Sequence, residues 1–422
     1  MPSENSASSL NLAICAIAAL TILGILIRPR NWPEAVWPSI GALLLLTFRL
    51  LTPAQAWHAV RQGSSVYLFL AGMMILAELA RRQGLFDYLA THAVTAARGS
   101  RTRLFLLVYG VGIVVTAVLS NDATAVVLTP AVYAAVKKTR VPVLPYLLIC
   151  AFIANAASFV FPISNPANLV IFGKHMLPLR DWVAVFALPS TISIFATYIA
   201  LRLVNRDSLR GAIDIEPGAT VLSHSGRIVG LGILASAIAL LAASAFNRDL
   251  GLATFLAAAL VFVAVLLFDR TAFLPVLKSA SWSILPLVAG LFVIVEALTT
   301  IGLAGEVRRA LHDLNSFPPL AASLAASFGI AAASNIANNL PVALLAGSVV
   351  QDHVPILLRH ALVIGVDLGP NFSITGSLAT ILWLIAIRRE GENVSFWQFL
   401  GIGVLVTAPA LFLTTFALLI SG

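Results

Sequence analysis

Four polar segments interrupt the apolar stretches of this chain, and they form two similar pairs. The first pair is Ser-Asn-Asp-Ala-Thr at 120–124 and Pro-Ile-Ser-Asn-Pro-Ala-Asn at 162–168. The second pair is Ser-Asn-Ile-Ala-Asn-Asn at 334–339 and Asp-Leu-Gly-Pro-Asn-Phe-Ser-Ile-Thr-Gly-Ser at 367–377. Hydroxyl and amide side chains both donate and accept hydrogen bonds, so they can bind a neutral solute rich in hydroxyl groups. A repeated pair of interrupted helices also indicates the binding site of a transporter.

The candidate binding residues are the hydroxyl and amide side chains of these segments, which contain no Lys or Arg. Taken singly, each such residue has a simpler explanation, because Ser, Thr and Asn also join transmembrane helices without any ligand. Their repeated spacing favours a site. We expect it to be lined by Ser120, Asn121, Thr124, Ser164, Asn165, Asn168, Ser334, Asn335, Asn338, Asn339, Ser373, Thr375 and Ser377.

Two carboxylates lie in the interruptions, Asp122 in the first and Asp367 in the last. A carboxylate at membrane depth is expensive to keep charged, so it is a functional candidate by default. We expect Asp122 and Asp367 to carry the protons that are coupled to transport. The alternative for each is a helix cap or an ion pair with an Arg of a neighbouring span.

The composition places the chain in a membrane. Hydrophobic residues make up 59% and charged residues 10% of the sequence, whereas a soluble domain has about 25% charged residues. Apolar runs recur from Leu10–Ile27 to Phe396–Ile420. We expect about ten full crossings of a bilayer core about 30 Å thick, together with shorter half-spans. Pro145–Phe161 is one of the expected crossings.

The interruptions must be enclosed, because an unpaired backbone group in hydrocarbon costs several kcal/mol. The helix expected at Asp122–Val136 would be about 22 Å long, which is too short for a crossing. This short length predicts a re-entrant hairpin whose tip is the segment 120–124. Pro and Gly in the segments 162–168 and 367–377 predict broken transmembrane helices.

Two halves of nearly equal length have the same order of features. We predict a first transmembrane repeat at 1–204, a cytoplasmic linker at 205–227 and a second transmembrane repeat at 228–422. The expected fold class is therefore an all-α polytopic membrane protein with two structurally repeated halves, re-entrant hairpins and broken transmembrane helices. The halves are inverted if each has an odd number of crossings, and inversion is common in such folds. The net charge of +8 comes from Lys and Arg in short loops, as the positive-inside bias expects, and indicates no nucleic-acid partner.

An intramembrane enzyme is the alternative from a different class, and the sequence gives it little support. Cys15 and Cys150 are far apart, so neither a disulfide nor a zinc site can be argued from them. The histidines lie mostly at the edges of spans and lack the paired spacing of a metalloenzyme motif. We expect no cofactor and no metal. The histidines are His58, His92, His175, His224, His312, His353 and His360.

Three motifs resemble the signatures of the ArsB-type arsenite and antimonite efflux pumps. They are 119–130, 334–341 and 367–383, and the third is the most specific. The resemblance extends from about Trp37 to the end of the chain. It also places the chain in the wider ion-transporter superfamily. The first motif departs from the family pattern in one respect. Ala123-Thr124 follows Asp122, where many relatives are expected to have a Gly, and this pattern is closer to that of the dicarboxylate carriers.

The resemblance implies a multi-pass protein of the bacterial inner membrane that exports trivalent arsenite and antimonite in exchange for protons. Some members pair with a soluble ArsA-type ATPase. The superfamily fold has a scaffold domain and a transport domain with two re-entrant hairpins. Asn121 and Asp122 would lie at the first hairpin tip and Asn335 at the second. The unwound crossing helices would carry Ser164, Asn165, Asn168, Ser373 and Thr375.

Arsenite near neutral pH is an uncharged trihydroxide, and a site of amides and hydroxyls matches its donors and acceptors. A dicarboxylate would need a cation in the site, and the four segments contain no Lys or Arg. A proton- or sodium-coupled carrier of a dicarboxylate or another anion remains the alternative within the same superfamily.

Overall fold

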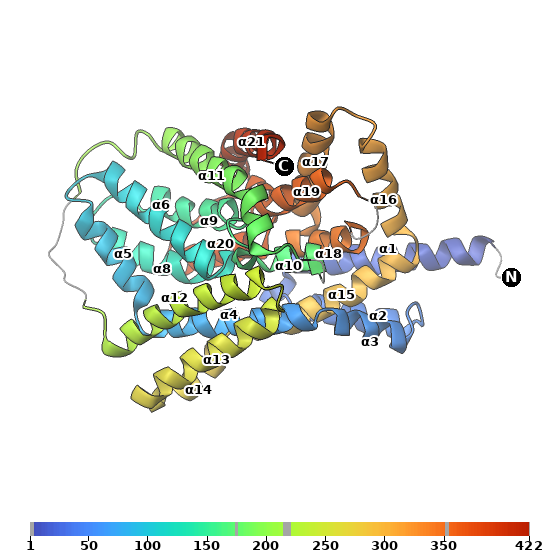
Figure 1. Cartoon of the computed structure of the whole chain (residues 1–422), viewed down its shortest axis with the longest axis horizontal. Helices are drawn as coiled ribbons and strands as arrows, with labels where there is room; N and C mark the ends of the chain where they lie inside the picture. Colours follow the sequence, from blue (N-terminus) through green and yellow to red (C-terminus); the bar gives the residue numbers. More distant parts are fainter. Residues whose placement is uncertain (1–3, 174–175, 214–220, 351–353, 422) are drawn as a thin grey trace.

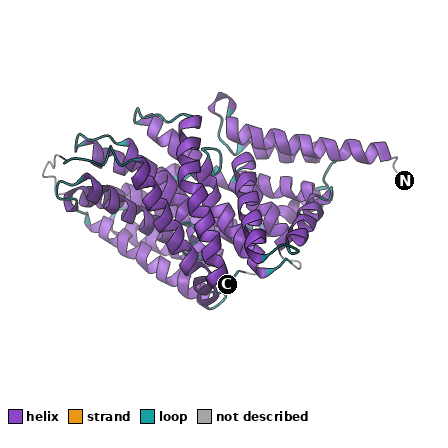
Figure 2. Cartoon of the chain, turned by 90° about the horizontal axis from the view of Figure 1, so that it is seen from above, coloured by secondary structure: helices purple, strands orange, loops and turns teal. Residues whose placement is uncertain are grey.

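The computed structural model describes residues 4–173, 176–213, 221–350 and 354–421. Within these ranges the regular elements are helices, with one isolated β-bridge between Ser100 and Ala212 (Figure 2). Nine of the described helical segments are long and apolar enough to cross a membrane, from Ser9–Ile27 to Phe396–Ser421. The predicted all-α polytopic membrane fold is therefore confirmed.

The described part of the first half contains eleven α-helices, which Figure 1 shows in blue to green. Short helical turns lie at Pro29–Asn31, Thr124–Leu128 and Pro162–Ser164. The α-helices are α1 (Glu4–Ile27), α2 (Val36–Thr47), α3 (Pro53–Gln62), α4 (Ser64–Arg82), α5 (Leu85–Ala96), α6 (Arg101–Val118), α7 (Asn121–Ala123), α8 (Thr129–Lys137), α9 (Leu144–Ala156), α10 (Pro166–Phe172) and α11 (Leu179–Val204).

The second half has a similar series of helices, in yellow to red in Figure 1. Short turns lie at Arg270–Ala272 and Gly369–Phe372. The α-helices are α12 (His224–Ala245), α13 (Leu250–Phe268), α14 (Phe273–Ser279), α15 (Ile284–Thr300), α16 (Leu303–Leu314), α17 (Pro319–Ala337), α18 (Asn339–Val350), α19 (Ile356–Leu368), α20 (Leu378–Arg389) and α21 (Phe396–Ser421).

Three pairs of helices at matching places in the two series have equal lengths. α5 and α16 have 12 residues each, α9 and α19 have 13, and α11 and α21 have 26. This agreement supports the proposed division into repeats 1–204 and 228–422, which remains a proposal. α12 already begins at His224, before the second boundary. Of the linker 205–227, residues 214–220 lie outside the described part of the chain.

The halves interlock through reciprocal helix contacts. α4 of the first half packs against α13 of the second, and α15 packs against α2. Glycine makes the first contact close: a Cβ on Gly72 would lie 2.8 Å from the Thr254 carbonyl oxygen. A Cβ on Gly290 would lie 2.7 Å from the carbonyl carbon of Pro38. Small residues at crossing points are the usual way for transmembrane helices to pack tightly.

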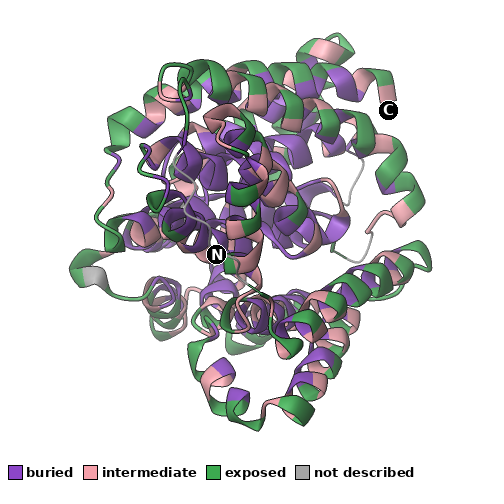
Figure 3. Cartoon of the chain, turned by 90° about the vertical axis from the view of Figure 1, so that its left-hand side faces the viewer, coloured by how far each residue is buried: buried purple, intermediate pink, exposed green. Residues whose placement is uncertain are grey.

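The two helices that precede the second interruption of each half are deeply enclosed. Every residue of α9 from Pro145 to Ala156 is buried, and so is every residue of α19 from His360 to Leu368. Figure 3 shows the buried residues at the centre and the exposed ones outside. Large apolar side chains are exposed on the outer helices, including Leu12 (72%) and Leu260 (72%), as lipid contact requires.

The close packing of α17 and α19 gives a stability prediction. A Cβ on Gly365 of α19 would overlap the carbonyl oxygen of Ser327 of α17. Gly365→Ala is therefore expected to destabilise the protein by about 1–3 kcal/mol, as a lower midpoint of thermal unfolding in detergent. The matched control is Gly329→Ala on α17, which meets open space. Equal midpoints for the two variants would contradict the close contact.

Candidate substrate site

The first hairpin turns at the predicted polar tip. α6 ends at Val118, and Ser120 has an extended backbone (φ −177°, ψ 166°) before α7 begins at Asn121. Ser120 Oγ accepts the N–H of Ala123 at 3.2 Å and so caps the new helix. A π-helical turn, Thr124–Leu128, then leads into α8 just before Pro130. A proline removes one helical hydrogen bond, which accounts for an irregular turn at this point.

The first broken helix stops earlier than expected. α9 ends at Ala156, not at Phe161 as the apolar run predicted. Side chains replace the missing helical bonds: the Ser158 hydroxyl donates to the Asn155 carbonyl at 2.8 Å, and Asn168 Nδ2 donates to the Ser158 carbonyl at 3.0 Å. Asn165 Oδ1 then accepts the N–H of Ala167 at 3.0 Å and caps α10.

The second hairpin differs from the prediction. The segment 334–339 was expected to interrupt the helix at Ser334, but α17 continues to Ala337. Asn335 fits inside the helix because its Nδ2 donates to the Ala331 carbonyl one turn earlier, at 2.8 Å. The chain turns at Asn338, which has a φ of 70°. With a ψ of 149° this residue has a backbone conformation that is found almost only for glycine, so the turn is strained.

The second broken helix closes around Asn335. The hydroxyl of Ser373 donates to Asn335 Oδ1 at 2.7 Å, and the hydroxyl of Thr375 donates to the Asn335 carbonyl at 2.9 Å. Asn335 Nδ2 also donates to the Gly369 carbonyl at 2.9 Å. Ser377 Oγ accepts the N–H of Thr380 at 3.1 Å and caps α20. The second hairpin and the second break therefore form one hydrogen-bonded unit.

Two pairs of buried side chains join the breaks of the two halves. Asn165 Nδ2 donates to Asp367 Oδ1 at 2.7 Å. Asn155 Nδ2 donates to Asn371 Oδ1 at 2.9 Å. Asn155, Asp367 and Asn371 are completely buried, and Asn165 is 1% exposed. Each pair links residues from different halves of the sequence, so the centre of the molecule is a polar junction between α9–α10 and α19–α20.

The first hairpin is attached to the same junction. The hydroxyl of Ser164, in the first break, donates to the Ala117 carbonyl of α6 at 3.0 Å. The four polar segments thus lie in one connected series. The first segment is joined through the adjacent end of α6, and the other three are joined by direct hydrogen bonds. No hydrogen bond directly joins 120–124 to 334–339 among the residues that the structure describes. The roles of these side chains in binding remain predictions.

Several predicted site residues keep polar atoms free for a ligand. Within the described ranges, no hydrogen-bond partner is found for Ser334 Oγ, Asn338 Nδ2, Asn168 Oδ1 or Asp367 Oδ2. Ser120, Asn121, Thr124 and Asn339 are buried, while Asp122, Asn335 and Thr375 are partly exposed. The backbone N–H of Asp122 donates to Asn121 Oδ1 at 2.9 Å.

Asn155 and Asn371 are the side chains of the junction that the prediction did not select. Asn155 lies inside the run expected to be a regular crossing, and Asn371 lies in the fourth segment. The matching positions of two residues could have identified Asn155. The helices α9 and α19 both have 13 residues, and Asn155 is the next-to-last residue of α9 just as Asp367 is the next-to-last residue of α19. In the proposed division into two repeats, the two residues occupy equivalent positions.

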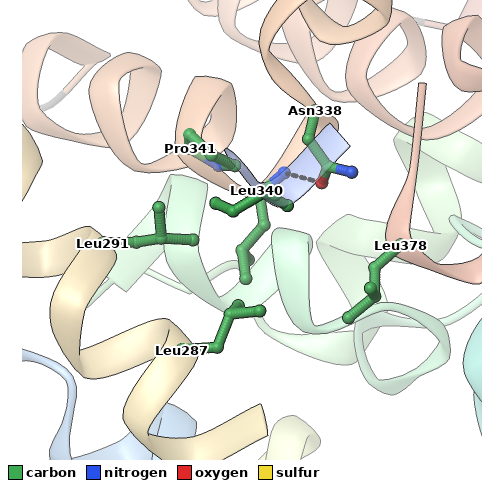
Figure 4. Close-up of a pocket in the computed structure, with 7 residues that line it drawn as sticks. Leu287, Leu291, Asn338, Leu340, Pro341 and Leu378 are labelled. Carbon is green, nitrogen blue, oxygen red and sulfur yellow. Dashed lines mark hydrogen bonds between the residues drawn. The ribbon is translucent and has the colours of Figure 1, made fainter. Parts of the chain in front are cut away.

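A small apolar pocket lies beside the second hairpin tip (Figure 4). Leu287 and Leu291 of α15 face Leu340 and Leu378 across it, with Asn338 at its edge. Asn338 Oδ1 accepts the N–H of Leu340 at 3.4 Å. Leucine side chains offer nothing to a hydroxylated solute, so the pocket separates the hairpin tip from α15 and is not the predicted binding site.

The histidines and carboxylates form no metal cluster in the described part of the chain. His175 and His353 lie outside it. His360 is an exception to the expectation that histidines lie at span edges, because it is buried inside α19 against Phe186. The ion-pair alternative also fails for Asp367 within the described ranges, where the ion pairs involve other carboxylates such as Glu34 and Glu78.

Comparison with known proteins agrees with the sequence motifs. A family model described as "Citrate transporter" (CitMHS) matches residues 22–371. The arsenical pump membrane protein of Escherichia coli (strain K12) is 27% identical over 96% of this chain and 97% of its own length. An uncharacterized transporter of Mycobacterium tuberculosis is 24% identical over 95% of this chain and 96% of its own length. The predicted resemblance to arsenical pumps is thereby confirmed.

A solved structure supports the fold. The YdaH transporter of Alcanivorax borkumensis, whose crystal structure is described as having an unusual topology, superposes with a TM-score of 0.54. The alignment covers 87% of this chain and 86% of the other, at 15% sequence identity. At this identity the similarity concerns the fold alone. With the nine candidate spans and the bacterial relatives, it places the chain as a multi-pass protein of the inner membrane.

Proposed function

Because the chain belongs to the citrate transporter family CitMHS and resembles arsenical pump membrane proteins over 96% of its length, we propose that it exports trivalent arsenite and antimonite. It does so as a secondary transporter, in exchange for protons, and confers arsenical resistance. The observation that supports this proposal most is the connected series of four polar segments, in which amide and hydroxyl groups surround a buried carboxylate.

The chemistry of the site suits arsenite. As(OH)₃ is neutral and has three O–H groups, each of which donates and accepts, and amides and hydroxyls provide both partners. Cys15 is exposed and Cys150 is buried, so the chain offers no thiol cluster to hold arsenic tightly. Weak oxygen and nitrogen contacts allow release. Asp122 and Asp367 carry the exchanged protons in this proposal, and a separate ArsA-type ATPase is a possible partner.

A carrier of citrate or another di- or tricarboxylate is the second candidate. The description of the matching family model favours it, and so does the Ala123-Thr124 pair in the first hairpin. The four polar segments contain no Lys or Arg to balance the charge of such an anion. Citrate transport would therefore need bound cations as counter-charges.

The proposal predicts arsenite uptake by everted membrane vesicles that contain the protein. Their lumen corresponds to the outside of the cell, so arsenite should accumulate there when respiration makes the lumen acidic. A protonophore should abolish the accumulation, and vesicles without the protein provide the control. Uptake that ignores the pH gradient would contradict proton exchange. Absence of arsenite uptake, together with thermal stabilisation by citrate and Na⁺, would favour the second candidate.

A further inference from the structure

The first part of the linker lies against the base of the first hairpin, where α6 begins. Ser100, the residue that caps α6, pairs with Ala212 in the isolated antiparallel β-bridge. Beside this bridge, the backbone N–H of Ile213 donates to the Gly99 carbonyl at 2.9 Å. We call residues 208–213 the strap. The strap is therefore joined to the hairpin base through backbone groups of both segments.

The side chain of Arg101 binds the strap at two points. Its Nε donates to the Ala212 carbonyl at 3.0 Å, and its Nη1 donates to the Ser208 carbonyl at 3.2 Å. Gly211 lies beside the guanidinium, because a Cβ on Gly211 would be 3.5 Å from Arg101 Cζ. A guanidinium presents several donors in one rigid plane, so a single side chain can serve both carbonyls. These bonds are also charge-assisted, which makes Arg101 the strongest side-chain link to the strap.

Apolar burial and a third side-chain hydrogen bond complete the contact. Leu209 and Ile213 of the strap are only 5% and 6% exposed. The Thr102 hydroxyl donates to the Leu209 carbonyl at 3.4 Å. The ion pairs of the neighbouring Asp207 are exposed, so they contribute little. The strap is therefore held by its backbone, by Arg101 and by its two buried side chains.

The hairpin base is in turn attached to α9 and α11. The Arg101 carbonyl accepts the hydroxyl of Tyr146 of α9 at 3.3 Å. Further along α6, the Tyr109 hydroxyl donates to the Ile194 carbonyl of α11 at 2.6 Å. The rings of Tyr109 and Tyr198 also pack against each other, with centroids 5.1 Å apart. The strap therefore belongs to one hydrogen-bonded group with α6, α9 and α11.

The other end of the linker is attached to a different group of helices. α12 begins at His224, and a Cβ on Gly226 would lie 2.8 Å from the Gln83 carbonyl oxygen at the end of α4. α12 also packs along α13. The linker thus joins a group that contains α6, α9 and α11 to a group that contains α4, α12 and α13. While the strap is attached, only the residues between 213 and α12 connect the two groups.

We propose that the strap stays closed on the hairpin base throughout the transport cycle, and that Arg101 is its positioning residue. The base of α6, the start of α9 and the end of α11 then remain one rigid unit. α6 has 18 residues, so a tilt at its base would displace the polar tip at Ser120, about 27 Å away. This inference goes beyond the proposed function, because the strap contains no predicted binding residue and its role does not depend on the substrate.

The first test measures how readily the strap opens in the purified full-length protein in detergent. Trypsin cleaves after Arg210 when the strap leaves the hairpin base, because proteases act on locally opened segments. Arg101→Ala should therefore accelerate this cleavage at least tenfold, as followed by mass spectrometry. The matched control Arg103→Ala changes an exposed arginine of the same turn and should leave the rate unchanged. Equal cleavage of the wild type and Arg101→Ala overturns the proposal.

Two further variants act from the strap itself. Gly211 has a φ of 106°, which suits glycine alone, so Gly211→Ala should also accelerate cleavage after Arg210. Ser208→Ala is the matched control, because Arg101 binds the carbonyl of this residue and not its hydroxyl. Cleavage after the exposed Arg389, at the end of α20, should be equal in all variants if the rest of the fold is intact.

The second test fixes the strap in place. Paired residues of an antiparallel bridge have Cα atoms about 4.5–5.5 Å apart, which suits a disulfide. Ser100→Cys/Ala212→Cys, in a protein whose Cys15 and Cys150 are replaced, should cross-link on mild oxidation, whereas neither single variant should. Arsenite uptake by oxidised everted vesicles should stay within about twofold of uptake by reduced vesicles.

The same cysteine pair separates a positioning role of Arg101 from a general loss of stability. Arg101→Ala should lower the maximal uptake rate at least fivefold, and oxidation of the pair in this variant should restore it. Loss of uptake on cross-linking, or no recovery in the oxidised Arg101→Ala protein, overturns the proposal. If no vesicle takes up arsenite, the proposed function fails instead. Cleavage and cross-linking then still judge the strap, and the uptake comparison is made with citrate and Na⁺.

Discussion

Asp367→Asn is expected to abolish arsenite accumulation driven by a pH gradient in everted vesicles, lowering the initial rate at least tenfold. The side chain keeps its size, and its Oδ1 can still accept the hydrogen bond from Asn165 Nδ2, which is 2.7 Å long in the wild type. It can no longer gain and lose a proton. Asp367 is completely buried and has no ion-pair partner in the described structure. The loss of an ionisable group at this position is therefore the main consequence of the substitution.

Two comparisons make this prediction specific. Asp313→Asn changes an exposed carboxylate and should leave uptake unchanged. Asp122→Asn tests the second proposed proton carrier, which is partly exposed at the first hairpin tip. If the double variant Asp122→Asn/Asp367→Asn still accumulates arsenite in response to the pH gradient, the assignment of proton coupling to these carboxylates is wrong.

Asn335→Ala is expected to remove arsenite resistance from a sensitive bacterial host almost completely. Its side chain donates to the Ala331 and Gly369 carbonyls and accepts from the Ser373 hydroxyl, so the substitution removes the side-chain bonds between the second hairpin and the second break. Each lost hydrogen bond contributes about 1 kcal/mol, and the stranded partners add to the penalty. The measurement is growth against arsenite concentration, with protein abundance in the membrane checked in parallel.

The neighbouring position provides the matched control for this experiment. Ile336 is 73% exposed, so Ile336→Ala truncates a side chain in the same helical turn without touching the polar junction. It should retain the resistance of the wild type. Equal loss in both variants would show that the turn, not the amide of Asn335, matters. Full resistance in Asn335→Ala would remove this residue from the proposed site.

The existence of the breaks could be predicted from sequence, but their exact positions could not. Pro162 and Pro166 lie four residues apart and together oppose a continuous helix, whereas the single prolines Pro189 and Pro409 are accommodated inside α11 and α21. Asn335 is different, because an asparagine can either end a helix or bond to the carbonyl one turn earlier, and local sequence does not decide between them. The structure shows the second outcome, since the Ala331 carbonyl accepts Nδ2 at 2.8 Å.

The connections between the segments were also beyond the reach of sequence patterns. Asn155 and Asn371 are 216 residues apart, and Asn165 and Asp367 are 202 apart. Their pairing depends on how α9 and α19 cross, which no local spacing encodes. A comparison of equivalent helices would have drawn attention to Asn155, because it occupies the position in α9 that Asp367 occupies in α19.

The equivalence of Asn155 and Asp367 has an energetic consequence for the transport cycle. Where like halves exchange their conformations to open first one side and then the other, identical halves would make the two openings equally stable. Here one half bears an ionisable acid at the shared position and the other bears an amide. In the proposed proton-coupled cycle, the proton concentration therefore shifts the balance between the two orientations, and moving the acid to residue 155 is expected to reverse this bias.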